Sequence, residues 1–178
     1  MEILETSRLV LRKWRMTDAE DLFDIMKSPS VIMGGWKPHS DINMSVEVLK
    51  EYVESNERWA IELKSNGKAI GSVRVYPDTN RGKFYAKSIN YVLSEEYHGN
   101  GYMTEAVRRM IKYLFEEKNV DLISAFRYPD NIKSKKVLEN CGFEYEITIE
   151  NGSQRYDGQF FDSICYSILK SDYERTNL

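Results

Sequence analysis

Two glycines between a predicted strand and a predicted helix constrain this chain more than any other feature. Residues 83–93 have the pattern of a strand, and Gly99 and Gly101 follow in a short polar segment. Apolar side chains then recur at helical spacing over about four turns, at Met103, Ala106, Val107, Met110, Ile111, Leu114 and Phe115. A strand end, a glycine turn and the start of a long helix therefore meet at one place.

This meeting point has the character of an anion-binding loop. Backbone N–H groups at a helix start carry the positive end of the helix dipole, and glycine lets an anion approach them closely. A plain strand-to-helix turn is the structural alternative. The standard phosphate motifs do not fit, because a dinucleotide fingerprint needs glycine where Thr104 stands and the P-loop lysine and the later kinase motifs are absent. An NAD- or ATP-binding domain is therefore disfavoured.

Length and composition favour one domain over residues 1–178 and exclude several classes of protein. A chain of 178 residues has the size of a single domain. No apolar run exceeds three residues, whereas a membrane span needs about 20. The net charge of −3 lacks the basic excess of a nucleic-acid binder. We expect a cytoplasmic protein, monomeric or homodimeric, without membrane or direct nucleic-acid contacts.

The cysteines and histidines give no sign of a metal site. Cys141 and Cys165 are the two cysteines, and His39 and His98 the two histidines. Their spacing matches no zinc motif, and two cysteines are too few for a disulfide framework in a chain of this length. We predict free thiols and no bound metal.

The order of predicted elements, β-α-α-β-β-β-α-β-α-β-β, defines an α/β (α+β) domain with a mixed sheet. The expected strands cover residues 8–14, 59–63, 70–76, 83–93, 121–127, 143–149 and 161–169. The expected helices cover residues 17–26, 45–58, 103–115 and 131–141. Thr17 to Glu20 fits a capping box, and Gly142 predicts a helix C-cap. Asn66-Gly67 and Asn151-Gly152 predict turns.

Four segments together resemble a known family. Residues 95–106, Glu-Glu-Tyr-His-Gly-Asn-Gly-Tyr-Met-Thr-Glu-Ala, are similar to motif A of the GNAT superfamily of acetyl-CoA-dependent N-acetyltransferases, with Glu96 at its first position. Residues 5–12, 131–143 and 162–166 resemble further segments of the branch that contains the ribosomal-protein N-terminal (alanine) acetyltransferases. The resemblance covers nearly the whole chain. It implies one GNAT-like domain with a mixed, mostly antiparallel sheet of about seven strands and about four helices.

The resemblance also implies acetyl-CoA as co-substrate. Loop amides would bind its pyrophosphate, and the end of the preceding strand would pair with the pantetheine arm. The implied cofactor-binding residues are Tyr91, Val92, Leu93, His98, Gly99, Asn100, Gly101, Tyr102, Met103, Thr104, Asn131, Ser134 and Lys136. Lys136 or Lys133 would contact the 3′-phosphate, while their neighbours Lys135, Arg108 and Arg109 have the pattern of a solvated helix face.

Asn131 and Ser134 are the residues implied in catalysis. They are three positions apart at a helix start and so share one face. The resemblance implies that Asn131 holds the pantetheine arm and that Ser134 donates a proton to the leaving thiolate. Without the resemblance, Asn131 or Asp130 is simply an N-cap and Ser134 a solvated helix residue.

Two departures from the family pattern leave the proton transfers open. Leu138 stands where many members have a tyrosine general acid. Ser88 stands where a carboxylate base often lies, and Asn90 replaces a glycine. A water chain, Asp162, Glu105 or the substrate's own arrangement could remove the amine proton.

The leading interpretation is an enzyme that transfers an acetyl group from acetyl-CoA to a primary amine, on a protein N-terminus or a small molecule, by direct attack in a ternary complex. Such attack needs the neutral amine, and Val92 or Leu93 could offer the oxyanion a backbone donor. The acceptor would bind near Trp36, His39 and Asp162, although Trp36 could instead be a lid on the core. The alternative is a non-catalytic CoA-binding sensor or structural module.

Overall fold

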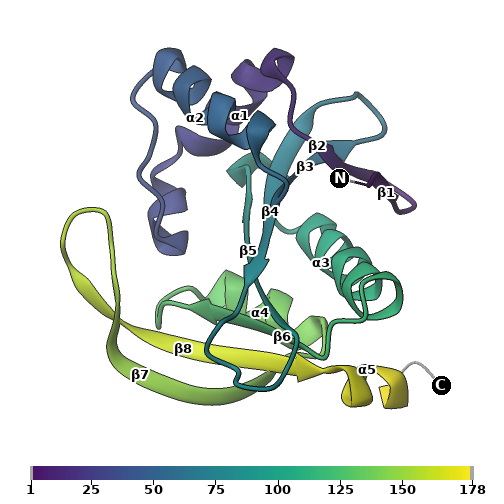
Figure 1. Cartoon of the computed structure of the whole chain (residues 1–178). Helices are drawn as coiled ribbons and strands as arrows, with labels where there is room; N and C mark the ends of the chain where they lie inside the picture. Colours follow the sequence, from purple (N-terminus) through teal and green to yellow (C-terminus); the bar gives the residue numbers. More distant parts are fainter. Residues whose placement is uncertain (1, 177–178) are drawn as a thin grey trace.

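A mixed sheet of eight strands organises the part of the chain that the structure describes (Figure 1). The computed structural model describes residues 2–176. The strands, in spatial order, are β1 (Leu4–Glu5), β2 (Leu9–Lys13), β3 (Arg58–Leu63), β4 (Ala69–Pro77), β5 (Ala86–Leu93), β6 (Leu122–Arg127), β8 (Phe160–Leu169) and β7 (Glu144–Gln154). Neighbours are antiparallel except β5 and β6, which are parallel. The sheet is therefore mixed and mostly antiparallel, as predicted.

Helices cover both faces of this sheet. They are α1 (Ala19–Met26), α2 (Ile42–Glu54), α3 (Tyr102–Lys112), α4 (Ile132–Asn140) and α5 (Lys170–Thr176), with the short helices η1 (Met16–Asp18), η2 (Pro29–Gly34), η3 (Glu95–Tyr97) and η4 (Tyr113–Glu117). Successive side chains of β3 point to opposite faces, so Ile61 packs in the core of α3 and α4 while Ala60 packs in the core of α1 and α2. In Figure 1, η2 and α3 lie on opposite sides of β5.

The structure adds elements whose local signals are weak. The eighth strand, β1, has only two residues and pairs with Leu11 and Val10 of β2. The short C-terminal helix α5 follows β8 directly. None of the helices within residues 2–176 is long and apolar enough to cross a bilayer.

Three predicted boundaries are wrong, two of them because a more distant contact decides and one because a different residue caps the helix. The capping box fails because Asp18, and not Thr17, precedes α1, and its carboxylate accepts bonds from Arg12. The second helix begins at Ile42, since Asp41 caps it by accepting from the N–H groups of residues 43 and 44.

The third wrong boundary is the Asn151-Gly152 turn. Asn151 has a φ of 50°, but β7 continues past it to Gln154, and the register with β8 shifts between Ile149 and Ser153. Asn151 therefore lies in a bulge, while the hairpin turns at Gly158, with a φ of 83°.

Arg12 of β2 is the centre of a buried polar network. Arg12 is 3% exposed, and its guanidinium donates to both oxygens of Asp18, at 2.8 and 2.9 Å, and to Glu62 of β3. The network fixes the start of α1 against the sheet.

We predict that Arg12→Met lowers the free energy of unfolding by about 3 kcal/mol, because it leaves the buried Asp18 carboxylate without its guanidinium. Urea denaturation measures this change. Arg74→Met is the control, since Arg74 pairs with Glu57 in a half-exposed ion pair and should cost less than about 1 kcal/mol. Equal losses in the two variants would contradict the role given to the network.

Candidate active site

Strands β5 and β6 separate after three paired residues. Pairing runs from Ala86–Leu122 to Ser88–Ser124 and stops there, although β5 continues to Leu93 with β4 as its partner. In the part of the chain that the structure describes, residues 89–93 have no strand partner on the β6 side. Their outward backbone groups can therefore bind an extended ligand, as an added strand would.

Hydrogen bonds fix the closed end of this opening. The hydroxyl oxygens of Ser88 and Ser124 are 2.6 Å apart, and Ser124 donates to Asp78 at 2.7 Å. Burial acts to raise the pKa of Asp78, but hydrogen bonds from Ser124 and Arg81 outweigh it and hold this pKa below its ordinary value. Ser88, at the position of the family's frequent base, is thus part of the strand junction.

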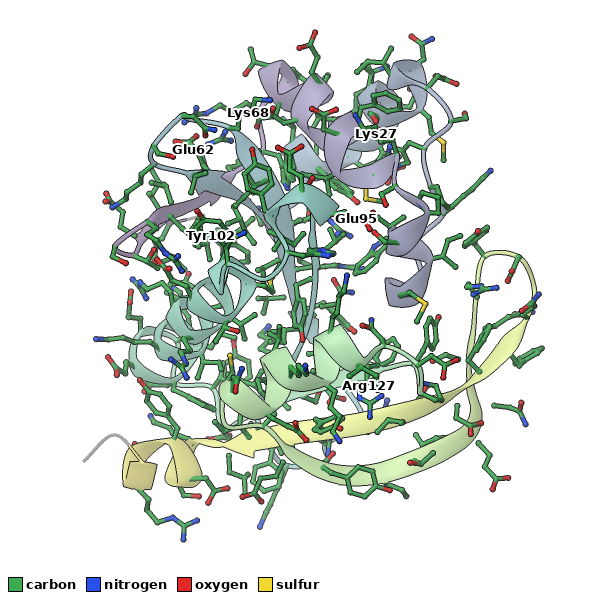
Figure 2. All side chains as sticks on the ribbon, turned by 180° about the vertical axis from the view of Figure 1, so that it is seen from behind. Lys27, Glu62, Lys68, Glu95, Tyr102 and Arg127 are labelled. Atoms are coloured by element: carbon green, nitrogen blue, oxygen red, sulfur yellow. The ribbon has the colours of Figure 1, made fainter. Side chains whose placement is uncertain are left out.

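A cavity of 870 Å³ opens beyond the junction, where β5 and β6 are no longer paired. It is lined by the ends of β5 and β6, the first turn of α3, residues along the whole length of α4, and the segment from η2 to Trp36. Every predicted cofactor-binding residue lines it except Asn100, whose side-chain amide donates to the carbonyl groups of Tyr97 and His98. Figure 2 shows Tyr102 at the start of α3 and Arg127 between α4 and β8.

The glycine loop adopts backbone conformations that favour glycine at two positions. Gly99 and Gly101 have φ of 80° and 77°, in the left-handed region. A Cβ at Gly99 would meet nothing within 4 Å, whereas one at Gly101 would face the guanidinium of Arg8 at 3.6 Å. His98 anchors the loop, with Nε2 3.1 Å from the Leu93 carbonyl and Nδ1 3.0 Å from the Lys133 ammonium.

Glu105 clamps this loop to the N-terminal segment. Its carboxylate accepts hydrogen bonds from Thr6 Oγ1 at 2.6 Å, Ser7 Oγ at 3.2 Å, and Arg8 N and Nε at 3.0 and 2.6 Å. Arg8 also donates to the Asn100 carbonyl at 3.0 Å. Burial acts to raise the pKa of Glu105, but these donors lower it below its ordinary value. Glu105, one of the candidate bases, therefore has a structural role.

The start of α4 joins three parts of the site. Asn131 caps the helix, with Oδ1 accepting from the Ser134 N–H at 3.1 Å, and its Nδ2 donates to the Met33 carbonyl at 2.7 Å. Ser134 Oγ lies 3.0 Å from the Tyr91 hydroxyl on β5. Burial raises the pKa of the Tyr91 phenol, so it stays protonated at neutral pH. Leu138 is fully buried in the core.

The three predicted acceptor residues do not come together. Trp36 lines the cavity. His39 is buried outside it, with Nδ1 2.7 Å from Ser45 Oγ, and burial lowers the pKa of its imidazole. Asp162 accepts from the Asn151 N–H at the β7 bulge and does not line the cavity.

Several cavity residues were missed from the sequence. Among them are Met33, Phe126, Tyr128 and Ile132. The available signal for this part of the site was a pair of aromatic residues: Phe126 at the end of the predicted strand over 121–127, and Tyr128 just after it. In the range 2–176, no cluster of three or more His, Cys, Asp or Glu residues is placed to hold a metal ion.

Comparison with known proteins identifies the family. A family model described as an acetyltransferase (GNAT) domain matches residues 8–144. An uncharacterized N-acetyltransferase of Bacillus licheniformis, p20, is 28% identical over 97% of this chain and 99% of its own length. The ribosomal-protein-S5-alanine acetyltransferase of Vibrio fischeri has a TM-score of 0.76 at 26% identity, covering 97% of this chain and 99% of that one.

A third protein shares the fold. The Microcin C7 self immunity acetyltransferase MccE, solved in complex with acetyl-CoA and AMP, has a TM-score of 0.76 at 19% identity, over 92% of this chain and 93% of its own. Because the family model covers more than half of the chain, the chain belongs to the GNAT acetyltransferase family. It is accordingly an acetyl-CoA-dependent N-acyltransferase.

We predict that Glu105→Gln lowers the free energy of unfolding by about 1–3 kcal/mol at pH 7, because the four donors lose their charged acceptor. The folded-state pKa of Glu105 is depressed, so its contribution is complete above the unfolded value of about 4.3. It is lost as the pH falls through the folded pKa, and the difference between the two proteins should shrink there.

Urea unfolding at pH 7, 5 and 3.5 measures this pH dependence. Glu20→Gln, at an exposed position of α1, is the control and should change stability little at any pH. A Glu105→Gln deficit that stays constant down to pH 3.5 would contradict the clamp.

Proposed function

We propose that the protein transfers the acetyl group of acetyl-CoA to a primary amine, by direct attack in a ternary complex held in the cavity between β5, α3 and α4. The separation of β5 from β6 in front of the α3 N-terminus is the observation that carries this proposal. The complex of MccE with acetyl-CoA and AMP supports the choice of cofactor.

The proposed binding mode uses the open edge of β5 and the glycine loop. The pantetheine arm would lie along Tyr91 to Leu93, and backbone N–H groups from His98 to Thr104 would bind the pyrophosphate. Lys133 and Lys136 line the same cavity and would contact the 3′-phosphate. The positive end of α3 and these ammonium groups offset the phosphate charge.

Ser134 and Tyr91 would act on the leaving group. As the amine nitrogen attacks the thioester carbonyl carbon, the carbon–sulfur bond breaks and a thiolate departs. The Tyr91 hydroxyl can donate a hydrogen bond to Ser134 Oγ. The Ser134 hydroxyl is then free to point at the sulfur and to give its proton to the departing thiolate. A backbone N–H of Val92 or Leu93 would stabilise the oxyanion.

The amine proton would leave without a dedicated carboxylate base. Glu105 is held in its clamp and Asp162 lies at the β7 bulge, so neither is placed for the transfer. We therefore assign the proton to water or to a group of the acceptor itself.

The acceptor would be a protein N-terminus or a small-molecule amine, in the cytoplasm. The Vibrio fischeri relative is named for ribosomal-protein-S5 alanine, which supports the first source. The test follows release of free CoA thiol from acetyl-CoA with peptides that begin with alanine and with small primary amines. Thiol release that requires an acceptor supports acetyl transfer. Cofactor binding without transfer to any acceptor would favour a CoA-binding sensor.

We predict that Gly99→Ala weakens acetyl-CoA binding at least about tenfold, because the new Cβ would stand where the pyrophosphate approaches the backbone. Isothermal titration measures the dissociation constant. Gly158→Ala is the matched control, since Gly158 has a φ of 83° and equally open surroundings in the β7–β8 turn. Both variants carry the same backbone strain, so equal affinities would count against the loop assignment.

We predict that Ser134→Ala and Tyr91→Phe each lower kcat about tenfold and leave the acetyl-CoA dissociation constant unchanged. Because Tyr91 acts through Ser134, the double variant should be no slower than Ser134→Ala alone. Tyr145→Phe on the exposed strand β7 is the control. Additive losses in kcat would show that the two hydroxyl groups do not work as a unit.

A further inference from the structure

Large apolar side chains gather on the η2 side of the cavity. Met33 and Trp36 come from the η2 segment, Phe126 and Tyr128 from the end of β6, and Ile132 from the start of α4. We call these five residues the aromatic wall. Three of them are exposed to an unusual degree for their type, with Met33 at 40%, Phe126 at 43% and Ile132 at 52%. An exposed apolar patch at a cavity marks a binding surface for an apolar group.

Two glycines of the neighbouring loop leave room for two rings of the aromatic wall. A Cβ at Gly34 would lie 1.9 Å from Cζ3 of Trp36, and one at Gly35 would lie 2.8 Å from the Tyr128 hydroxyl. Glycine at both positions therefore lets the two rings rest against the loop. The Tyr128 ring also packs against Phe126, with centroids 6.4 Å apart. These contacts hold the rings in place before any ligand arrives.

The charges of the cavity disfavour a polycationic acceptor. Of the cavity-lining residues within the described range, Asp130 is the one carboxylate, against Arg127, Lys133 and Lys136. Because Lys133 and Lys136 are assigned to the cofactor phosphates, the point that bears on the acceptor is the single carboxylate: a polyamine would find no acidic surface to bind. A monoamine whose remaining surface is apolar needs no further carboxylates and can bury that surface against the aromatic wall.

Resting on the acetyl transfer proposed above, we propose that the acceptor is a monoamine carried by an aromatic or bulky apolar group that packs against the aromatic wall. The wall would bind the body of the acceptor and direct its amine toward the end of β5, where the thioester would lie. The same chemistry is present in a free arylalkylamine and in a peptide that begins with an aromatic residue.

The first experiment compares kcat/KM for acetyl transfer to 2-phenylethylamine, Phe-Gly-Gly, ethylamine, Ala-Gly-Gly and spermidine. We expect each aromatic acceptor to exceed its small counterpart by about tenfold or more, because only it buries a ring. The better of the two aromatic probes identifies the source of the amine. Equal values for aromatic and small acceptors, or a preference for spermidine, would overturn the proposal.

A matched pair of variants locates the effect. Phe126→Ala should reduce kcat/KM for the aromatic acceptors toward that of the small ones. Phe84 is equally exposed, at 41% against 43%, and lies on the β4–β5 loop outside the cavity, so Phe84→Ala should leave all values unchanged. Stabilisation by acetyl-CoA in thermal unfolding should persist in both variants. Equal effects of the two substitutions would contradict the wall.

A fluorescence titration tests the wall without turnover. Trp36 is partly exposed in the cavity, whereas Trp14 and Trp59 are 1% and 5% exposed. With CoA present, 2-phenylethylamine should change the emission saturably, and Trp36→Phe should abolish the change. Saturable binding without acetyl transfer would support the wall and contradict the proposed reaction. The absence of a saturable change would overturn the proposal that the aromatic wall binds the acceptor, whatever the outcome for acetyl transfer.

Discussion

The site depends on the early separation of β5 from β6. In a continuous sheet the backbone groups of both strands would bond to each other, and no cavity could form between them. Here the Ser88–Ser124 contact closes the junction, and the Tyr91–Ser134 contact joins β5 to α4 across the gap. The same interruption therefore supplies an open strand edge, a cavity and access to the α3 N-terminus.

Glu105 makes the glycine loop part of the rigid framework. Its partners Thr6, Ser7 and Arg8 lie almost a hundred positions earlier in the chain, yet they form one hydrogen-bonded unit with it. Residues 5–12 and 95–106 both resemble segments of the family, and this unit gives a physical reason why they occur together. The opening segment holds the carboxylate, and the carboxylate holds the first turn of α3.

Sequence patterns predicted the parts of the fold that local chemistry decides. The spacing of apolar residues predicted α3, and Asn131 and Gly142 marked the ends of α4. The Asn151 turn failed because pairing with β8, a distant segment, sets the length of β7. For the same reason the sequence could not place Tyr91 beside Ser134, or Trp36 and Tyr128 on one wall, since these contacts join separate elements.

Thermal unfolding in parallel with saturating acetyl-CoA, CoA, NAD and ATP tests the central claim most directly. At 100 times its dissociation constant, a ligand of the folded state adds about 2.7 kcal/mol. For a chain of this length that corresponds to a rise in Tm of roughly 5–10 °C. We predict such a rise with acetyl-CoA and CoA and none with NAD or ATP. No rise with acetyl-CoA or CoA would contradict the assignment of the opening between β5 and β6 as the cofactor site.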